Sequence, residues 1–90
     1  NPSFDRDFCN FNFKKAKIDF QFGYRNVDLH SVAYAYFTAT EQHFEKLTSD
    51  DIYKLLEMPE EPRPHNALVG AKFEAEAFSR LINGKSIIDL

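Results

Sequence analysis

The stretch PHNALVGAKFEAEAFSRLI, from Pro64 to Ile82, most constrains what this chain can fold into. Its apolar residues recur at spacings of three and four, which predicts an amphipathic helix over residues 67–82. Asn66 precedes the run and is a favourable N-cap, and Asn83-Gly84 is a typical helix end. Two interpretations are open: the helix reads nucleic acid, or it packs in a core and meets another protein.

Two more helices are expected upstream. Residues 29–46 carry apolar side chains at helical spacing, with Asp28 as the N-cap. Thr48 followed by Asp51 forms a capping pattern for a second helix over residues 49–57, whose acidic first turn suits the helix dipole. Pro59 ends that helix, and the segment EEPRP is a stiff, extended connection.

The remaining segments have the patterns of β-strands. Between residues 16 and 24 apolar and polar residues alternate, which is typical of a half-buried strand. The alternation changes phase at Lys14-Lys15, which indicates a bulge or a tight turn. Residues 4–11 fit either a strand or a helix. SIIDL at the end of the chain predicts a short strand over residues 86–89.

Three helices, a turn and a strand follow the order of a winged helix-turn-helix. Two motifs carry the resemblance: TSDDI from Thr48, and PHNALVGAKF from Pro64 with Leu81-Ile82 at the helix end. Over Ser31 to Ile82, about half of its length, the chain resembles small winged-helix modules of phage and plasmid proteins. The resemblance implies an α+β fold in which the amino-terminal strand segment pairs with the carboxy-terminal strand.

We therefore expect one domain over residues 1–90, with a strand segment at 1–25 and a helix-turn-helix core with its terminal strand at 26–90. Gly70 costs about 1 kcal/mol in a helix interior, so we expect the preceding helix to approach closely there. The predicted core consists of Ile18, Phe20, Phe22, Val32, Tyr36, Phe37, Phe44, Ile52, Leu55, Leu56, Leu68, Ala71, Ala75, Phe78 and Ile82.

Charge is distributed unevenly along the chain. Residues 1–25 contain five Lys/Arg and three Asp/Glu, a net charge of +2, whereas residues 26–90 contain six and eleven, a net charge of −5. A polyanion would therefore favour the amino-terminal third. Cys9 is the single cysteine, which excludes an intrachain disulfide and suits a reducing cytoplasm. The sequence has no membrane-spanning run and no secretory signal.

No catalytic signature is present, so the sequence predicts no enzyme and no cofactor. His30, His43 and His65 lie far apart and lack the spacing of a metal site. His65 is assigned a role at the helix entrance, with a phosphate contact as the alternative. The Asp50-Asp51 pair is expected to serve as a cap, because adjacent carboxylates at a helix start stabilise its dipole.

The resemblance implies a non-catalytic, cytoplasmic nucleic-acid-binding module of a phage or mobile element, with DNA as partner. The phenylalanines among the basic residues of the amino-terminal segment form either a base-stacking surface or part of the core. Lys14, Lys15, Lys17, Arg63, Lys72, Arg80 and Lys85 would neutralise phosphates, and Asn66 would lie nearest the bases.

The alternative function is a protein-interaction module or a small phage inhibitor. Such a module would occupy the basic groove of a host DNA-processing or defence protein through an acidic helix face, formed by Glu74 and Glu76. A third interpretation is that the chain is the structured end of a larger protein.

Overall fold

The structure, a computed structural model, describes residues 2–90, and within that range it contains four helices and no strand. The helices are α1 (Pro2–Lys15), α2 (Leu29–Ala39), α3 (Ser49–Leu55) and α4 (Ala67–Asn83). The predicted α+β winged-helix fold is therefore wrong. The strands expected at residues 16–24 and 86–89 are absent, and so is the wing that they would have formed.

All three predicted helix starts are confirmed. Asp28 accepts a hydrogen bond from the backbone N–H of Ser31, and the Asn66 side chain accepts from Leu68 and Val69. Thr48 and Asp51 form a reciprocal capping box at the start of α3. These contacts are local in sequence, which explains why residue type alone places them correctly.

Three helices end at a charged residue in the left-handed conformation. Lys17, Glu41 and Glu57 have φ values of 59°, 61° and 59° and follow α1, α2 and α3. In each case the next residue donates its backbone N–H five residues back, as Gln42 does to Phe37, which is the Schellman pattern. The predicted helix over residues 29–46 is therefore too long, because the chain turns at Glu41.

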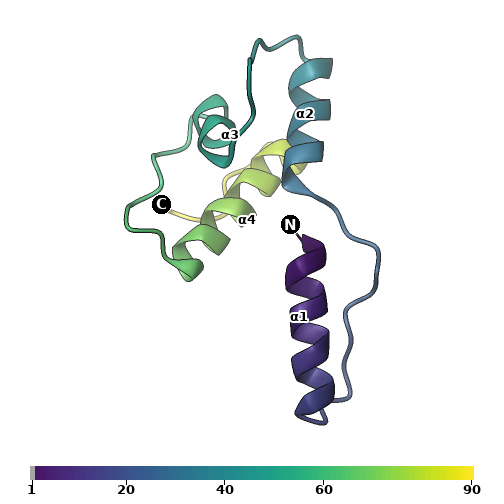
Figure 1. Ribbon diagram of the computed structural model, residues 1–90. Coiled ribbons are helices and arrows are strands. Elements are labelled where there is room, and N and C mark those ends of the chain that lie inside the picture. Colours follow the sequence, from purple (N-terminus) through teal and green to yellow (C-terminus); the bar gives the residue numbers. More distant parts are fainter. Residues whose placement is uncertain (1) are drawn as a thin grey trace.

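The core lies where α2, α3 and α4 meet (Figure 1). α4 crosses α2, and α3 closes the third side. Phe37 and Ile52 are completely buried, and Tyr53 packs its ring against Phe73 with centroids 5.3 Å apart. The buried apolar residues are Leu29, Ala33, Phe37, Ile52, Tyr53, Met58, Phe73, Ala77 and Leu81.

The predicted core is correct for Phe37 and Ile52 and wrong for more than half of its other members. Val32, Phe44, Leu55, Leu56 and Phe78 are half-buried and pack against the core. The following are exposed instead: Ile18, Phe20, Phe22, Tyr36, Leu68, Ala71, Ala75 and Ile82. On α4 the wrong side of the helix was predicted to be buried. The side that faces the core carries Phe73, Ala77 and Leu81.

The amino-terminal residues form a separate hairpin-like unit. α1 contains no buried residue and contacts none of the other helices; the chain returns beside it towards α2 (Figure 1). Asn10 accepts from the backbone N–H of Phe22 and donates to its carbonyl, and Arg6 donates to the carbonyl of Tyr24. Alternate residues of the returning segment thus face α1, which produces a strand-like pattern without a strand.

The unit makes the molecule less compact than a typical domain of its size. The radius of gyration is 15.1 Å, whereas about 12 Å is expected for a globular chain of this length. No helix within residues 2–90 is both long and apolar enough to cross a membrane.

Gly70 does not mark the predicted close helix approach. A Cβ added there would meet only the carboxylate of Glu61, at 3.8 Å. The position borders the pocket described next.

Candidate functional site

An open pocket of about 560 Å³ lies between the first turn of α1, the start of α3 and the first half of α4. Its titratable side chains come from all three helices and from the connection before α4: Asp5, Asp50, Tyr53, Glu61, His65 and Glu74. Four of these are carboxylates, so the pocket favours a positively charged or hydrogen-bond-donating ligand group.

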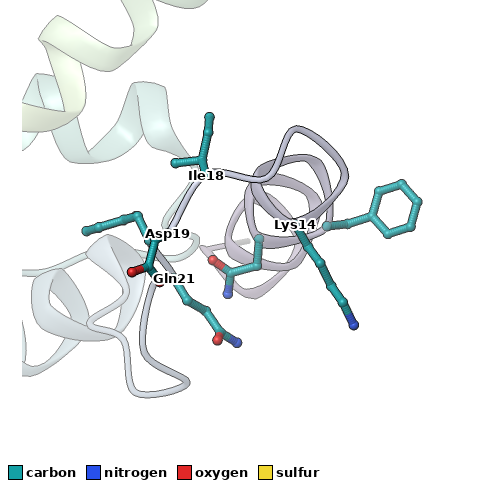
Figure 2. Close-up of a pocket in the computed structure, with 7 residues that line it drawn as sticks. Lys14, Ile18, Asp19 and Gln21 are labelled. Carbon is teal, nitrogen blue, oxygen red and sulfur yellow. The ribbon is translucent and has the colours of Figure 1, made fainter.

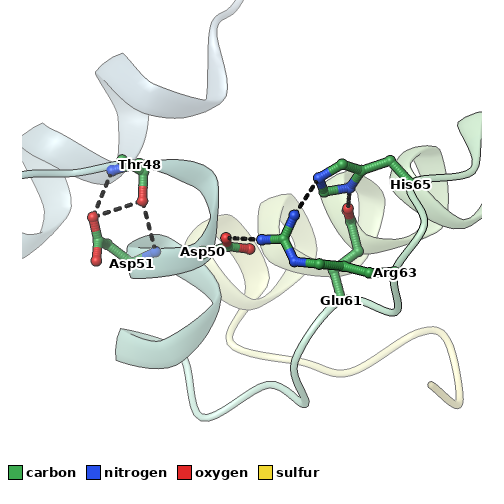
Figure 3. A network of polar contacts seen from close by, with 6 residues as sticks. All are labelled: Thr48, Asp50, Asp51, Glu61, Arg63 and His65. Atoms are coloured by element: carbon green, nitrogen blue, oxygen red, sulfur yellow. Dashed lines mark hydrogen bonds and ion pairs between the residues drawn. The ribbon is translucent and has the colours of Figure 1, made fainter.

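A chain of polar contacts runs along one side of this pocket (Figure 3). Asp50 Oδ2 lies 3.0 Å from Arg63 Nη2, and Arg63 Nη1 lies 2.8 Å from His65 Nε2. The other ring nitrogen of His65, Nδ1, contacts Glu61 Oε2 at 2.5 Å. A guanidinium only donates, so Nε2 is the acceptor and Nδ1–H donates to Glu61; the imidazole is neutral in this arrangement.

Local structure explains how these groups converge. The connection Glu61-Pro-Arg-Pro-His65 is not extended as expected, because the chain bends at Arg63 and Pro64 and the peptide bond between them is cis. This places Glu61, Arg63 and His65 together. Asp50 is presented by the first turn of α3, which the Thr48–Asp51 capping box fixes, with Thr48 Oγ1 accepting from the Asp51 N–H. The spacing of these residues alone does not predict the cluster, because the bend at Arg63-Pro64 is what brings their side chains together.

The pocket acts electrostatically on Tyr53, which lies on its floor. Burial, and then the negative charges of Glu74, Glu61 and Asp50, raise the pKa of this phenol to about 12. The side chain is 3% exposed and packs against Phe73. Tyr53 is therefore a neutral core residue, and the raised pKa reflects first its burial and then the carboxylates around it.

A second polar cluster, the tail clasp, lies in the core. Glu76 is completely buried; its Oε2 accepts from Arg80 Nε at 2.6 Å, and its Oε1 accepts from the backbone N–H groups of Ile87 and Ile88. Arg80 also donates to the carbonyl of Leu56, at the end of α3. The clasp thus joins α3, α4 and the carboxy-terminal tail.

The clasp changes the acidity of Glu76. Burial opposes ionisation, but hydrogen bonds from Ile87, Arg80, Ser86 and Ile88 outweigh it and lower the pKa to about 2. The carboxylate is charged and fully paired. Glu76, predicted to lie on an exposed acidic face, is therefore inaccessible to a partner, whereas Glu74 is exposed as expected.

The residues predicted to contact nucleic acid do not form one surface. Lys14 and Lys15 lie in the last turn of α1, and Lys17 follows in the left-handed turn, so none of the three lies on a strand. Figure 2 shows Lys14 on α1 and Ile18, Asp19 and Gln21 on the segment that follows it. These three lysines form a group at one end of the molecule.

The other predicted nucleic-acid contacts are dispersed or already bonded. Arg63 is paired with Asp50, Arg80 belongs to the tail clasp, and the Asn66 carbonyl caps α4. Lys72 is exposed on α4, and Lys85 follows the helix end with its carbonyl bonded to Ser79. The frame that would present these residues to a DNA groove is absent.

The feature that sequence reasoning misplaced is a second apolar face of α4. Leu68, Ala71, Ala75 and Ile82 project away from the core; Leu68 is 64% and Ile82 is 63% exposed. We call these four residues the outward face. Because the opposite side of α4 is also apolar, α4 has the composition of a helix that is covered on both sides.

Within residues 2–90 no group of three or more His, Cys, Asp or Glu side chains is placed to hold a metal ion. No protein-family model, curated protein or solved structure matches the chain.

Proposed function

We propose that this chain is a protein-interaction module that docks through the outward face of α4. One observation carries the proposal: four apolar residues follow one another along a helix whose other side already fills the core. Single exposed apolar side chains are ordinary, but several on one stripe of a helix are typical of an interface. The stripe is interrupted between Ala75 and Ile82, where Phe78 packs against the core. A cytoplasmic location belongs to the proposal, since Cys9 has no partner for an intrachain disulfide.

The composition of the face supports a polypeptide partner. Ala71 and Ala75 occupy its middle, where small side chains allow another backbone to approach closely. Leu68 and Ile82 lie towards its ends and offer bulky anchors. Glu74 lies beside the face on one edge and Lys72 on the other, so the face has no net positive charge that would attract a nucleic acid.

Nucleic-acid binding remains a prediction with weaker support. Of the predicted phosphate contacts, Lys14, Lys15 and Lys17 form one group, Lys72 and Lys85 are exposed but lie elsewhere, and the larger part of the chain is acidic. Binding that depends on phosphate contacts weakens steeply with salt. If no single- or double-stranded DNA is bound at about 50 mM salt, this function is excluded.

The interaction proposal is tested by affinity capture with matched variants. The tagged chain, its Ala75→Arg variant and its Val27→Ser variant are incubated with nuclease-treated lysate that also contains an untagged copy of the chain. Ala75 is central to the outward face, whereas Val27 is an exposed apolar residue outside it.

We expect a defined partner to be retained by the wild type and by Val27→Ser, and lost with Ala75→Arg, because a buried charge without a counter-charge prevents docking. Equal capture by all three proteins would refute a role for the outward face.

A second candidate function is acid–base catalysis in the acidic pocket, and the Glu61–His65 contact favours it. The Glu61 side chain is only 10% exposed and orients the imidazole through Nδ1–H. A neutral histidine held in this way can accept a proton at Nε2. Arg63, which now donates to Nε2, is 61% exposed and can be displaced by a substrate.

This candidate is tested with chromogenic carboxylic esters, phosphate mono- and diesters and glycosides, with and without added Mg²⁺ or Mn²⁺. Any hydrolysis should fall by about a hundredfold or more in His65→Ala and in Glu61→Gln. Glu60→Gln is the matched control outside the pocket. Hydrolysis that persists in His65→Ala would show that this pocket is not the catalytic site.

A further inference from the structure

The row of phenylalanines on α1 is an uncovered apolar face. Phe4, Phe8 and Phe11 are 67%, 62% and 68% exposed. Their spacing of four and three places them on one face of the helix, and Lys15 continues that face one turn further. The other side of α1 is occupied by the returning segment, through Asn10 and Phe13.

The basic end of α1 complements one edge of the outward face of α4, the edge bordered by Glu74, whereas Lys72 borders the other edge. Lys14 and Lys15 end α1 in a basic turn, where they also complement the helix dipole. Glu74 borders the outward face near its amino-terminal half, next to the pocket that holds Asp50 and Glu61. An antiparallel arrangement of the two helices would bring the basic end of one to the acidic border of the other.

We infer that the partner of the outward face is α1 of a second copy of this chain, in a reciprocal two-fold dimer; the inference rests on the proposed function of that face. Phe4, Phe8 and Phe11 cover the row from Leu68 to Ile82, and Lys15 meets Glu74. Because the same contact forms twice, the dimer closes and leaves no open end for further copies.

The dimensions of the two faces agree. At 1.5 Å per residue, Phe4 to Lys15 extends about 16 Å and Leu68 to Ile82 about 21 Å. A phenylalanine side chain can bury about 150–250 Å², so three of them and the outward face, counted on both copies, supply on the order of 1,400 Å². Stable interfaces bury about 1,200–2,000 Å².

The test is analytical ultracentrifugation of the full chain between about 1 and 200 µM, a range that brackets a micromolar dissociation constant. We expect a monomer–dimer equilibrium in the wild type. Phe8→Ser and Ala75→Arg should each weaken dimerisation by more than about tenfold, whereas Val27→Ser should not. Far-UV circular dichroism of each variant verifies that the helices are retained.

A charge exchange provides a second test that does not remove apolar contacts. Lys15→Glu should weaken the dimer by about fivefold, and adding Glu74→Lys should restore it. Failure of the double variant to recover would contradict the antiparallel arrangement.

The outcomes separate this inference from the proposed function. A wild type that stays monomeric throughout the concentration range overturns the dimer and leaves docking to another protein for the capture experiment. A dimer that is lost in Ala75→Arg but kept in Phe8→Ser shows that the outward face docks without α1. A dimer that survives Ala75→Arg overturns this inference, because the copies then meet elsewhere, and the capture experiment alone decides whether another protein docks on the outward face.

Discussion

Glu76 and Arg80 lie one turn apart on α4 and share a hydrogen bond of 2.6 Å, yet their other bonds extend to segments distant in sequence. Glu76 accepts from Ile87 and Ile88, and Arg80 donates to Leu56 at the end of α3. An i,i+4 ion pair on a helix surface contributes little. This pair is different because its carboxylate is buried and its partners join three parts of the chain.

We expect Glu76→Gln to lower the free energy of unfolding by about 2–3 kcal/mol, since it removes charge-assisted hydrogen bonds and leaves Arg80 without its counter-charge. Urea denaturation measures the loss. Glu74→Gln, an exposed change two residues away, is the control and should alter stability by less than about 0.5 kcal/mol. Equal effects of the two variants would contradict the burial of Glu76.

The Glu76 carboxylate also predicts that the free energy of unfolding falls at acidic pH. The pKa of Glu76 is about 2 in the folded protein and has an ordinary value of 4.5. Its stabilising contribution is therefore complete above pH 4.5, declines as the unfolded state takes up a proton, and vanishes below about pH 2. The difference in thermal midpoint between wild type and Glu76→Gln should narrow between pH 5 and pH 2. A constant difference would show that the carboxylate is not ionised in the fold.

The orientation of α4 is tested by two truncations. Phe73 is 3% exposed in the core, so Phe73→Ala should cost about 3–5 kcal/mol. Ile82 is 63% exposed on the outward face, so Ile82→Ala should cost less than about 0.5 kcal/mol in the monomer. Both are measured by denaturation at low protein concentration. The reverse order would mean that α4 is rotated.

Gly70 offers a stabilising substitution. It lies inside α4 with an ordinary helical backbone, and an added Cβ meets only the Glu61 carboxylate, at 3.8 Å. Gly70→Ala should therefore raise the free energy of unfolding by about 0.5–1 kcal/mol. Gly84→Ala should act in the opposite direction, because Gly84 has a φ of 66° that residues with a Cβ adopt at a cost. Thermal denaturation of both variants shows whether each substitution raises or lowers the stability.

Sequence patterns located the starts of α2, α3 and α4, but they did not identify α1 or the way the helices pack. Capping at Asp28, Thr48 and Asn66 depends on neighbouring residues and is readable from the sequence. The end of α2 depends on Glu41 in a left-handed conformation, which a glycine would have signalled and a glutamate does not. The two apolar sides of α4 were both visible, but only tertiary contacts decide which side faces α2 and α3.

The strand pattern of residues 16–24 failed for a different reason. Phe20 and Phe22 do alternate towards one side, and both pack against the ring of Phe13 on α1. The surface that they meet is a helix, and the backbone of Phe22 bonds to the side chain of Asn10 instead of to another strand. The alternation of apolar and polar residues therefore correctly indicated that one side of this segment is in contact with another part of the chain. It did not indicate whether that part is a strand or a helix.

The candidate site was only partly readable. Arg63, Asn66 and His65 were recognised as polar residues at the entrance of α4, but the contact of Arg63 with Asp50 depends on where α3 lies. Asp5 reaches the same pocket from a helix more than forty residues earlier in the chain. Such convergence has no local signature.

The tail clasp also bears on hydrogen exchange. Ile87 and Ile88 belong to a segment without helix or strand, where amide protons ordinarily exchange with solvent within seconds. Their N–H groups, however, are bonded to a carboxylate that solvent does not reach. These two amides should exchange only when the tail detaches from α4 or the whole core opens, so they report the opening of the tail residue by residue.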